Sequence, residues 1–98
     1  MDSAILRALR AVVDPELGLD IVSLGLVYAA EREGDLARVT MTLTSRACPL
    51  GAMLSEDART AVESLVPGVR RAEVELCFEP LWTPERMSPE ARAQLGAA

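Results

Sequence analysis

Hydrophobic residues recur with a helical spacing in two stretches of the chain. Over residues 5–12 and 50–65 they fall three and four positions apart, which predicts two amphipathic helices. Pro15 disfavours helical geometry at the residue before it, so the first helix is expected to stop near Val13. Pro49 suits the first turn of the second helix, because a proline there loses no helical hydrogen bond.

Three other stretches have the composition or the apolar–polar alternation of strands with one buried face. They cover residues 24–31, 36–44 and 71–79, and the alternation is clearest in the second. Glu33-Gly34-Asp35 predicts a tight connection between the first two strands. We therefore expect these two strands to form a hairpin.

The C-terminal part carries two further helix-start signals. Thr83-Pro84-Glu85 suits a single turn, and Ser88-Pro89-Glu90 opens a short helix that is expected to end near Gly96. The predicted order is α-β-β-α-β plus a short C-terminal helix. Because three strands with one apolar face need helices on that face, we expect an α+β two-layer sandwich with a three-stranded mixed sheet. A chain of 98 residues suits one domain over residues 1–98.

Composition and charge narrow the function. The net charge of −5 and the lack of a basic cluster argue against nucleic-acid binding. No apolar run is long enough to cross a membrane and the N-terminus lacks a signal peptide, so we expect a cytoplasmic protein. The chain has no histidine, which removes the commonest metal ligand and the commonest general base.

Cys48 is the strongest candidate for chemistry. It directly precedes Pro49 and is expected near the N-cap of the second helix. Unpaired N–H groups and the helix dipole favour a thiolate at that position, and a thiolate is both the nucleophile and the metal ligand. Arg46 adds positive charge nearby. The alternative is a small buried cysteine or an ordinary cap without chemistry.

Cys77 is the second thiol and falls, by strand parity, on the glutamate face of the last predicted strand. Both cysteines are expected to be free thiols in a reducing compartment, and their separation matches no zinc or ferredoxin spacing. One thiol without histidine cannot complete a four-ligand metal site in a monomer. Any cluster would therefore need a second subunit, a partner or small-molecule thiols.

Three carboxylates crowd the loop after the first helix: Asp14, Glu16 and Asp20. They could bind a hard cation or orient a thiol or a partner, but ordinary turn chemistry explains them as well. Among the threonines of the second strand, we interpret Thr40 and Thr42 as part of a solvated face.

Two residues outside that loop remain candidates for the site. Thr44 lies closest to Cys48 among the strand threonines and is kept for that reason. Trp82, the only tryptophan, could contact a partner or cover a pocket, or simply close the edge of the core.

Four blocks of sequence, in order, resemble the signatures of the metal–sulfur cluster biosynthesis family. That family includes SufT-like proteins, PaaD-like proteins and the N-terminal domain of some scaffold ATPases of the Mrp type. The blocks are residues 13–28, resembling VxDPExGxxIVxLGLVY; residues 41–44 with Cys48-Pro49, resembling MTLTxxxCP; residues 67–69, resembling PGV; and residues 82–88, resembling WTPxxMS. Two segments depart from the family pattern, with Ser45-Arg46-Ala47 in place of TPG and residues 79–82 in place of DPPW.

The resemblance implies an α+β fold and a role in maturing iron–sulfur proteins. It places the family's motif cysteine on Cys48, its acidic pair on Asp14 and Glu16, and its threonine on Thr44, all around one shallow site. No cysteine-rich C-terminal extension is present, which favours the SufT-like form over the PaaD-like form.

The leading hypothesis is an accessory factor in iron–sulfur cluster assembly or transfer, with Cys48 as a transient ligand for iron or a cluster, or as a docking thiol. Its partners would be an assembly scaffold and client apoproteins, a homodimer is a possible state, and no permanently bound cofactor is expected. The alternatives are a non-catalytic adaptor and a PaaD-like factor for a phenylacetate-type oxygenase. A thiol-dependent enzyme is disfavoured, because no histidine base and no deep pocket are expected.

Overall fold

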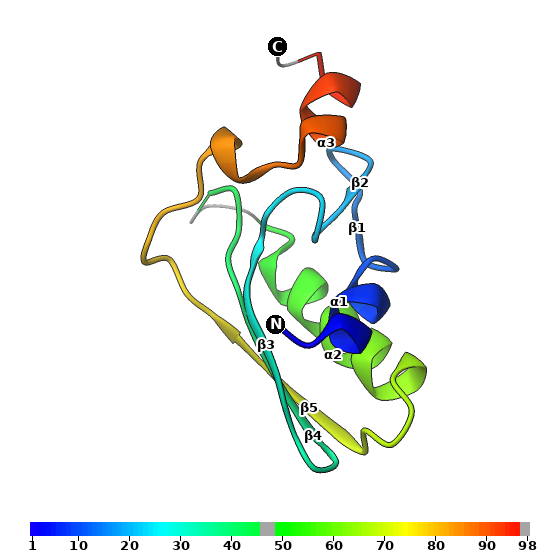
Figure 1. Ribbon diagram of the computed structural model, residues 1–98. Coiled ribbons are helices and arrows are strands. Elements are labelled where there is room, and N and C mark those ends of the chain that lie inside the picture. Colours follow the sequence, from blue (N-terminus) through cyan, green and yellow to red (C-terminus); the bar gives the residue numbers. More distant parts are fainter. Residues whose placement is uncertain (46–48, 97–98) are drawn as a thin grey trace.

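The computed structural model describes residues 1–45 and 49–96, arranged as a small sheet with helices on one side (Figure 1). The elements are α1 (Ser3–Leu9), β1 (Val13–Asp14), β2 (Leu19–Asp20), β3 (Val27–Glu33), β4 (Leu36–Met41), α2 (Gly51–Leu65), β5 (Arg71–Leu76), the 3₁₀-helix η1 (Pro84–Arg86) and α3 (Pro89–Gln94). The predicted α+β class and element order are confirmed, and the two-residue strands β1 and β2 are added to them.

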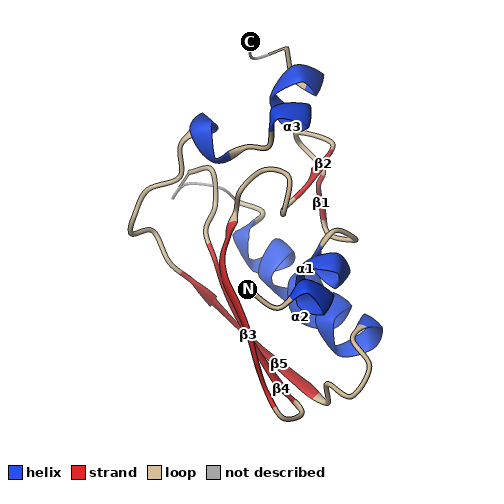
Figure 2. Cartoon of the chain, in the orientation of Figure 1, coloured by secondary structure: helices blue, strands red, loops and turns tan. Residues whose placement is uncertain are grey.

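The main sheet has the strand order β3-β4-β5 and is mixed, as expected. β3 and β4 form the predicted antiparallel hairpin, whereas β5 returns parallel to β4 after the crossover through α2. Val39 of β4 lies opposite Ala30 of β3 and Val74 of β5, so these three side chains share one face. Figure 2 shows α1 and α2 packed on one side of this sheet, with the other side open.

The core between the sheet and the helices is aliphatic. Its largest fully buried hydrophobic side chains are Ile5, Leu9, Ile21, Leu24, Leu26, Met41, Leu54, Val39 and Val62. Burial of apolar side chains of this size contributes roughly 1.5–3 kcal/mol each before conformational entropy is subtracted. The fully buried centre of the core therefore relies on aliphatic side chains and methionine.

Several element boundaries differ from the sequence prediction. α1 ends at Leu9 rather than near Val13, because the carbonyl of Val12 accepts a hydrogen bond from Ile21 and the chain turns into β1. α2 begins at Gly51 with Leu50 as its N-cap, so Pro49 lies before the helix and not in its first turn.

The strand boundaries also shift, by two or three residues at most ends. β3 covers residues 27–33 instead of 24–31, and β4 and β5 end at Met41 and Leu76, earlier than alternation predicted. Alternation continues in the sequence beyond those ends, but the backbone there leaves the ladder to form loops.

The segment after β5 folds back over the loop that precedes β3; residues 77–88 are called the strap below. The indole Nε1 of Trp82 donates to the carbonyl of Leu24 at 2.7 Å, and the N–H of Ser88 donates to the carbonyl of Ser23 at 2.8 Å. The Ser88 hydroxyl also caps α3 by accepting from the N–H of Ala91 at 3.1 Å, as the sequence predicted. The strap is thus fixed at its middle and at its C-terminal end.

Within residues 1–45 and 49–96, no helix combines the length and the apolar character that crossing a membrane requires.

Candidate functional site

The segments expected to form the site leave the same end of the sheet. Backbone hydrogen bonds link them side by side: Ile21 N to Val12 O, Leu26 N to Ile21 O, Thr42 N to Leu26 O and Cys77 N to Met41 O, all between 2.8 and 3.0 Å. These hydrogen bonds therefore join four segments into one continuous layer of backbone (Figure 1). The segments are residues 14–20, called the acidic loop below, the start of β3, the end of β4 and the end of β5. Sequence distance hides this proximity, which only the fold creates.

Asp14 is one of two buried polar side chains among the described residues, with 4% of its surface exposed. Its Oδ1 accepts hydrogen bonds from the backbone N–H groups of Glu16 at 2.8 Å and Leu17 at 3.4 Å. This is an Asx turn, so turn chemistry accounts for Asp14. Glu16, in contrast, is exposed.

Asp20 also serves the local fold. Its Oδ2 accepts the backbone N–H of Ser23 at 2.9 Å, and its Oδ1 accepts the Ser23 hydroxyl at 2.7 Å. Arg10 approaches the same carboxylate at 3.9 Å. In the part of the chain that the structure describes, no three Asp, Glu, Cys or His side chains gather closely enough to hold a metal ion.

The threonines at the end of β4 differ from the expected solvated face. Thr40 is half-buried, whereas Thr42 is 0% exposed and its Oγ1 has no hydrogen-bond partner among the described residues. The interpretation of Thr42 as solvated is wrong, because the alternation of buried and exposed side chains stops where β4 ends, and Met41, Thr42 and Leu43 are all buried. Thr44 is half-buried in the bend that follows.

An unpartnered buried hydroxyl is costly, by roughly 1–3 kcal/mol. Thr42 is therefore a buried polar residue next to the candidate site whose burial the sequence did not predict. The sequence gives no signal for this burial, because strict alternation places Thr42 on the face opposite to Met41 and Leu43.

Cys48 and Arg46 lie outside the described residues. The flanking segments are described: Thr44 precedes them, and an exposed Pro49 and the N-cap Leu50 follow. Leu50 makes no side-chain capping bond, and the helix starts later than predicted. The N-cap is Leu50, two positions after Cys48 in the sequence, and the expectation that Cys48 lies near the N-cap concerns a residue outside the described part of the chain.

The start of α2 is packed tightly against the segment that leads to this loop. A side chain at Gly51 would place its Cβ 2.8 Å from Cδ1 of Leu43, so glycine allows the helix to approach the end of β4. The first turn of α2 and the residues after β4 therefore hold the two ends of the loop close together.

Cys77 and Trp82 belong to the strap, which begins beside the end of β4, where Cys77 bonds to Met41. Cys77 is a free, half-buried cysteine whose Sγ lies 3.2 Å from the carbonyl oxygen of Glu79. Trp82 is half-buried and packs against the core, in line with the interpretation that it closes the core edge. Arg86 stacks over the ring of Tyr28 at 4.6 Å and adds a cation–π contact to the same strap.

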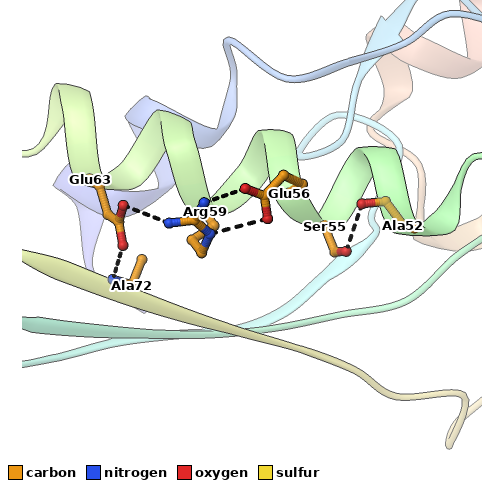
Figure 3. Close-up of polar contacts among 6 residues, drawn as sticks. All are labelled: Ala52, Ser55, Glu56, Arg59, Glu63 and Ala72. Carbon is orange, nitrogen blue, oxygen red and sulfur yellow. Dashed lines mark hydrogen bonds and ion pairs between the residues drawn. The ribbon is translucent and has the colours of Figure 1, made fainter.

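Shifted pKa values occur away from this loop end. On the side of α2 next to β5, Arg59 donates hydrogen bonds to both Glu56 and Glu63, as Figure 3 shows. The hydrogen bond from Arg59 lowers the pKa of Glu56, and in turn Glu56 raises the pKa of Arg59. A hydrogen bond with Thr83 lowers the pKa of Glu85 in the strap. These shifts mark exposed ion pairs and a turn.

Comparison with known proteins shows the family of the chain. The profile of the iron–sulfur cluster assembly protein family matches residues 2–76. The Fe–S protein maturation auxiliary factor YitW of Bacillus subtilis is 46% identical over 93 residues, which is 94% of this chain and 90% of that protein. The Fe–S protein maturation auxiliary factor SufT of Staphylococcus aureus is 40% identical over 88 residues, covering 89% and 99% of the two chains.

The fold agrees with a solved relative. The crystal structure of a domain of unknown function from Bacillus anthracis superimposes with a TM-score of 0.89 at 42% identity, covering 96% of this chain and 90% of that one. The relatives from Bacillus subtilis and Staphylococcus aureus are both named as maturation auxiliary factors. The resemblance drawn from the four sequence blocks is confirmed, and the chain belongs to the iron–sulfur cluster assembly protein family.

Proposed function

We propose that this protein is an auxiliary factor in the maturation of iron–sulfur proteins, in which Cys48 transiently binds iron or a cluster or docks on a client's cysteine. The observation that carries the proposal is its similarity to maturation auxiliary factors over nearly the whole chain. We propose further that the chain acts as one domain in the cytoplasm, without enzymatic turnover. Its partners are then an assembly scaffold and client apoproteins.

The side-chain inventory favours iron or a cluster as cargo over a resident cofactor. The chain has no histidine and two cysteines, and no metal-binding group of three forms among the described residues. An iron–sulfur cluster takes thiolate ligands, usually four. Cargo held through Cys48 would therefore share its remaining ligands with a second copy, a scaffold, a client or small thiols, and such a site can release what it holds.

The neighbouring residues are assigned supporting roles. Asp14 fixes the turn that carries Glu16, and Glu16 supplies an exposed carboxylate at the loop end. Thr44 places a hydroxyl in the bend that leads toward Cys48. These positions support an arrangement in which Asp14, Glu16 and Thr44 shape the approach to the thiol.

The test uses the two cysteines as a matched pair, because each substitution replaces one sulfur atom by an oxygen atom. Wild-type protein, Cys48→Ser and Cys77→Ser are purified without oxygen, and bound iron and acid-labile sulfide are measured after reconstitution. The same variants replace the wild-type gene in cells, where the activities of iron–sulfur enzymes are followed. We expect Cys48→Ser to lower cargo binding and enzyme activity, and Cys77→Ser to leave both near wild type. Full function of Cys48→Ser would refute the role of the thiol.

A second candidate, a pure adaptor, has one observation in its favour. Leu76 and Leu81 are large apolar side chains with 37% and 58% of their surface exposed, at either end of the segment that leads to Trp82. In an adaptor, clients would bind such a surface and Cys48 would only shape its loop. Client capture that survives Cys48→Ser, together with no iron on wild-type protein, would favour the adaptor.

A further inference from the structure

The strand β5 lies at the margin of the main sheet and pairs on one side only. Glu75 lies opposite Thr40 of β4, and the N–H of Cys77 donates to the carbonyl of Met41. Backbone groups of successive strand residues point to opposite sides, so Val74 and Leu76 direct their N–H and C=O groups away from β4. No strand in the described part of the chain pairs with that outer edge (Figure 2).

The beginning of this outer edge is already occupied by a side chain. Oε2 of Glu63 on α2 accepts the N–H of Ala72 at 2.9 Å, as a carbonyl of a neighbouring strand would. Oε1 of the same carboxylate accepts a hydrogen bond from Arg59 at 2.9 Å, which fixes its orientation (Figure 3). The capped part ends there, and no hydrogen bond among the described residues occupies the outer edge at Val74 and Leu76.

A second copy of the chain fits this edge poorly. An antiparallel pairing centred on Val74 sets Glu73 of each chain opposite Glu75 of the other, and one centred on Glu75 sets two identical carboxylates opposite each other. Like charges directly opposite destabilise a sheet. A pairing centred on Glu73 would bring Arg71 opposite Glu75, but it needs the backbone N–H that Glu63 already binds.

The charges beside the edge indicate what does fit. Glu73 and Glu75 project from the open face of the sheet, and both are exposed. Arg38 lies 3.8 Å from Glu73, and Arg71 also pairs with Glu73, whereas Glu75 has no ion pair among the described residues. On the other face of β5, Leu76 is 37% exposed. An incoming strand therefore meets unneutralised negative charge on one face and apolar surface on the other.

We propose that the outer edge of β5, from Val74 to Leu76, binds an extended segment of a partner protein in which basic and apolar residues alternate. Its backbone continues the sheet beside β5. Its basic side chains lie next to Glu75 on the open face, and its apolar side chains cover Leu76. The inference goes beyond the proposed function, since pairing at this edge does not require Cys48.

The test uses the full chain and two peptides of equal composition. Acetyl-Lys-Val-Lys-Val-Lys-amide has the required alternation, and acetyl-Lys-Lys-Lys-Val-Val-amide has the same charge without it. Binding is followed by amide chemical shifts of isotope-labelled protein. We expect the alternating peptide to shift the amides of Val74 and Leu76 and to bind more tightly than the scrambled peptide.

Two charge reversals separate pairing at the edge from general attraction. Glu75→Lys changes the proposed contact, and Glu31→Lys makes the same change on the same face but on β3. Replacing an attractive cross-strand pair by a repulsive one should weaken the alternating peptide about tenfold in Glu75→Lys and much less in Glu31→Lys. Val74→Pro removes one edge N–H, which an edge strand tolerates, and should also weaken binding.

Three results would overturn the inference. One is equal binding of the two peptides, and another is an equal effect of the two charge reversals. The third is dimerisation of the peptide-free protein with shifts at Val74 and Leu76, since a second copy would then occupy the edge.

Discussion

The packing of the strap against Gly25 yields the sharpest stability prediction. Gly25 has φ +76°, and a side chain there would place its Cβ 2.2 Å from the carbonyl oxygen of Arg86 and 2.7 Å from its Cβ. The obstacle is backbone, so no side-chain rotation relieves it. Gly25→Ala must therefore move the strap or the loop before β3.

The expected magnitude has two parts. An L-residue with a left-handed backbone costs about 1–2 kcal/mol. Moving the strap also weakens the bonds from Trp82 to Leu24 and from Ser88 to Ser23, each contributing about 1 kcal/mol net. Together these give a loss of about 3–4 kcal/mol in the free energy of unfolding, a large part of the stability of a small domain.

Gly18→Ala is the matched control for the backbone term. Gly18 has φ +71°, but nothing lies within 4 Å of a Cβ built there. It should lose only about 1–2 kcal/mol. Urea unfolding followed by the fluorescence of Trp82 measures both variants, and a detached strap should also change the Trp82 emission of Gly25→Ala before any urea is added. Equal losses in the two variants, with unchanged emission, would refute the close contact between Gly25 and the strap.

Two further substitutions test individual polar groups. Thr42→Val keeps the shape of a buried side chain but removes a hydroxyl without a hydrogen-bond partner among the described residues, so urea unfolding should show no loss or a gain of about 1 kcal/mol; a clear loss would mean that the hydroxyl is bonded. Glu63→Gln removes the charge that binds both Arg59 and the N–H of Ala72, and should cost about 1 kcal/mol and speed hydrogen exchange at Ala72; unchanged exchange would contradict the cap.

The elements of the fold were predictable because their signals are local. Alternation marked β4 and β5, and the helical spacing marked α2, since each buries one face against the same core. Ser88 predicted the start of α3, because its capping hydroxyl accepts a hydrogen bond from an N–H group only three residues further along the chain. Such signals depend on neighbours in the sequence and survive without knowledge of tertiary structure.

The ends of elements were less predictable, because distant segments decide them. α1 stops at Leu9 because the carbonyl of Val12 accepts a hydrogen bond from Ile21, the residue after β2. Nothing in the sequence near Val12 predicts that partner. Thr42 is buried for a similar reason. Its N–H donates a hydrogen bond to the carbonyl of Leu26, which holds the backbone after β4 against the loop before β3. In both cases a tertiary hydrogen bond overrides a periodic pattern.

The candidate site divides along the same line. Turn chemistry at Asp14 was weighed from the sequence, and its bonds to the N–H groups of Glu16 and Leu17 are local. That the acidic loop shares one end of the sheet with Thr44 could only come from the fold or from the family resemblance. The roles of Cys48 and of the residues around it remain predictions that the thiol variants test.

The open edge of β5 and the end of the sheet that carries the candidate site meet at the last residue of β5. Leu76 is the last residue of β5, and the N–H of the next residue, Cys77, bonds to Met41 beside the buried Thr42. A segment paired with Val74 and Leu76 would extend along β5 toward the end of the sheet from which the acidic loop and Thr44 also emerge. The edge could therefore hold a partner's backbone while residues beyond the paired segment reach the loop end. This geometry separates two tasks, since recognition would rest on backbone pairing and charge at Glu75, and transfer on a thiol that need not recognise anything. A factor with few ligands of its own needs such a division, because cargo bound weakly enough to be released gives little affinity for holding the partner.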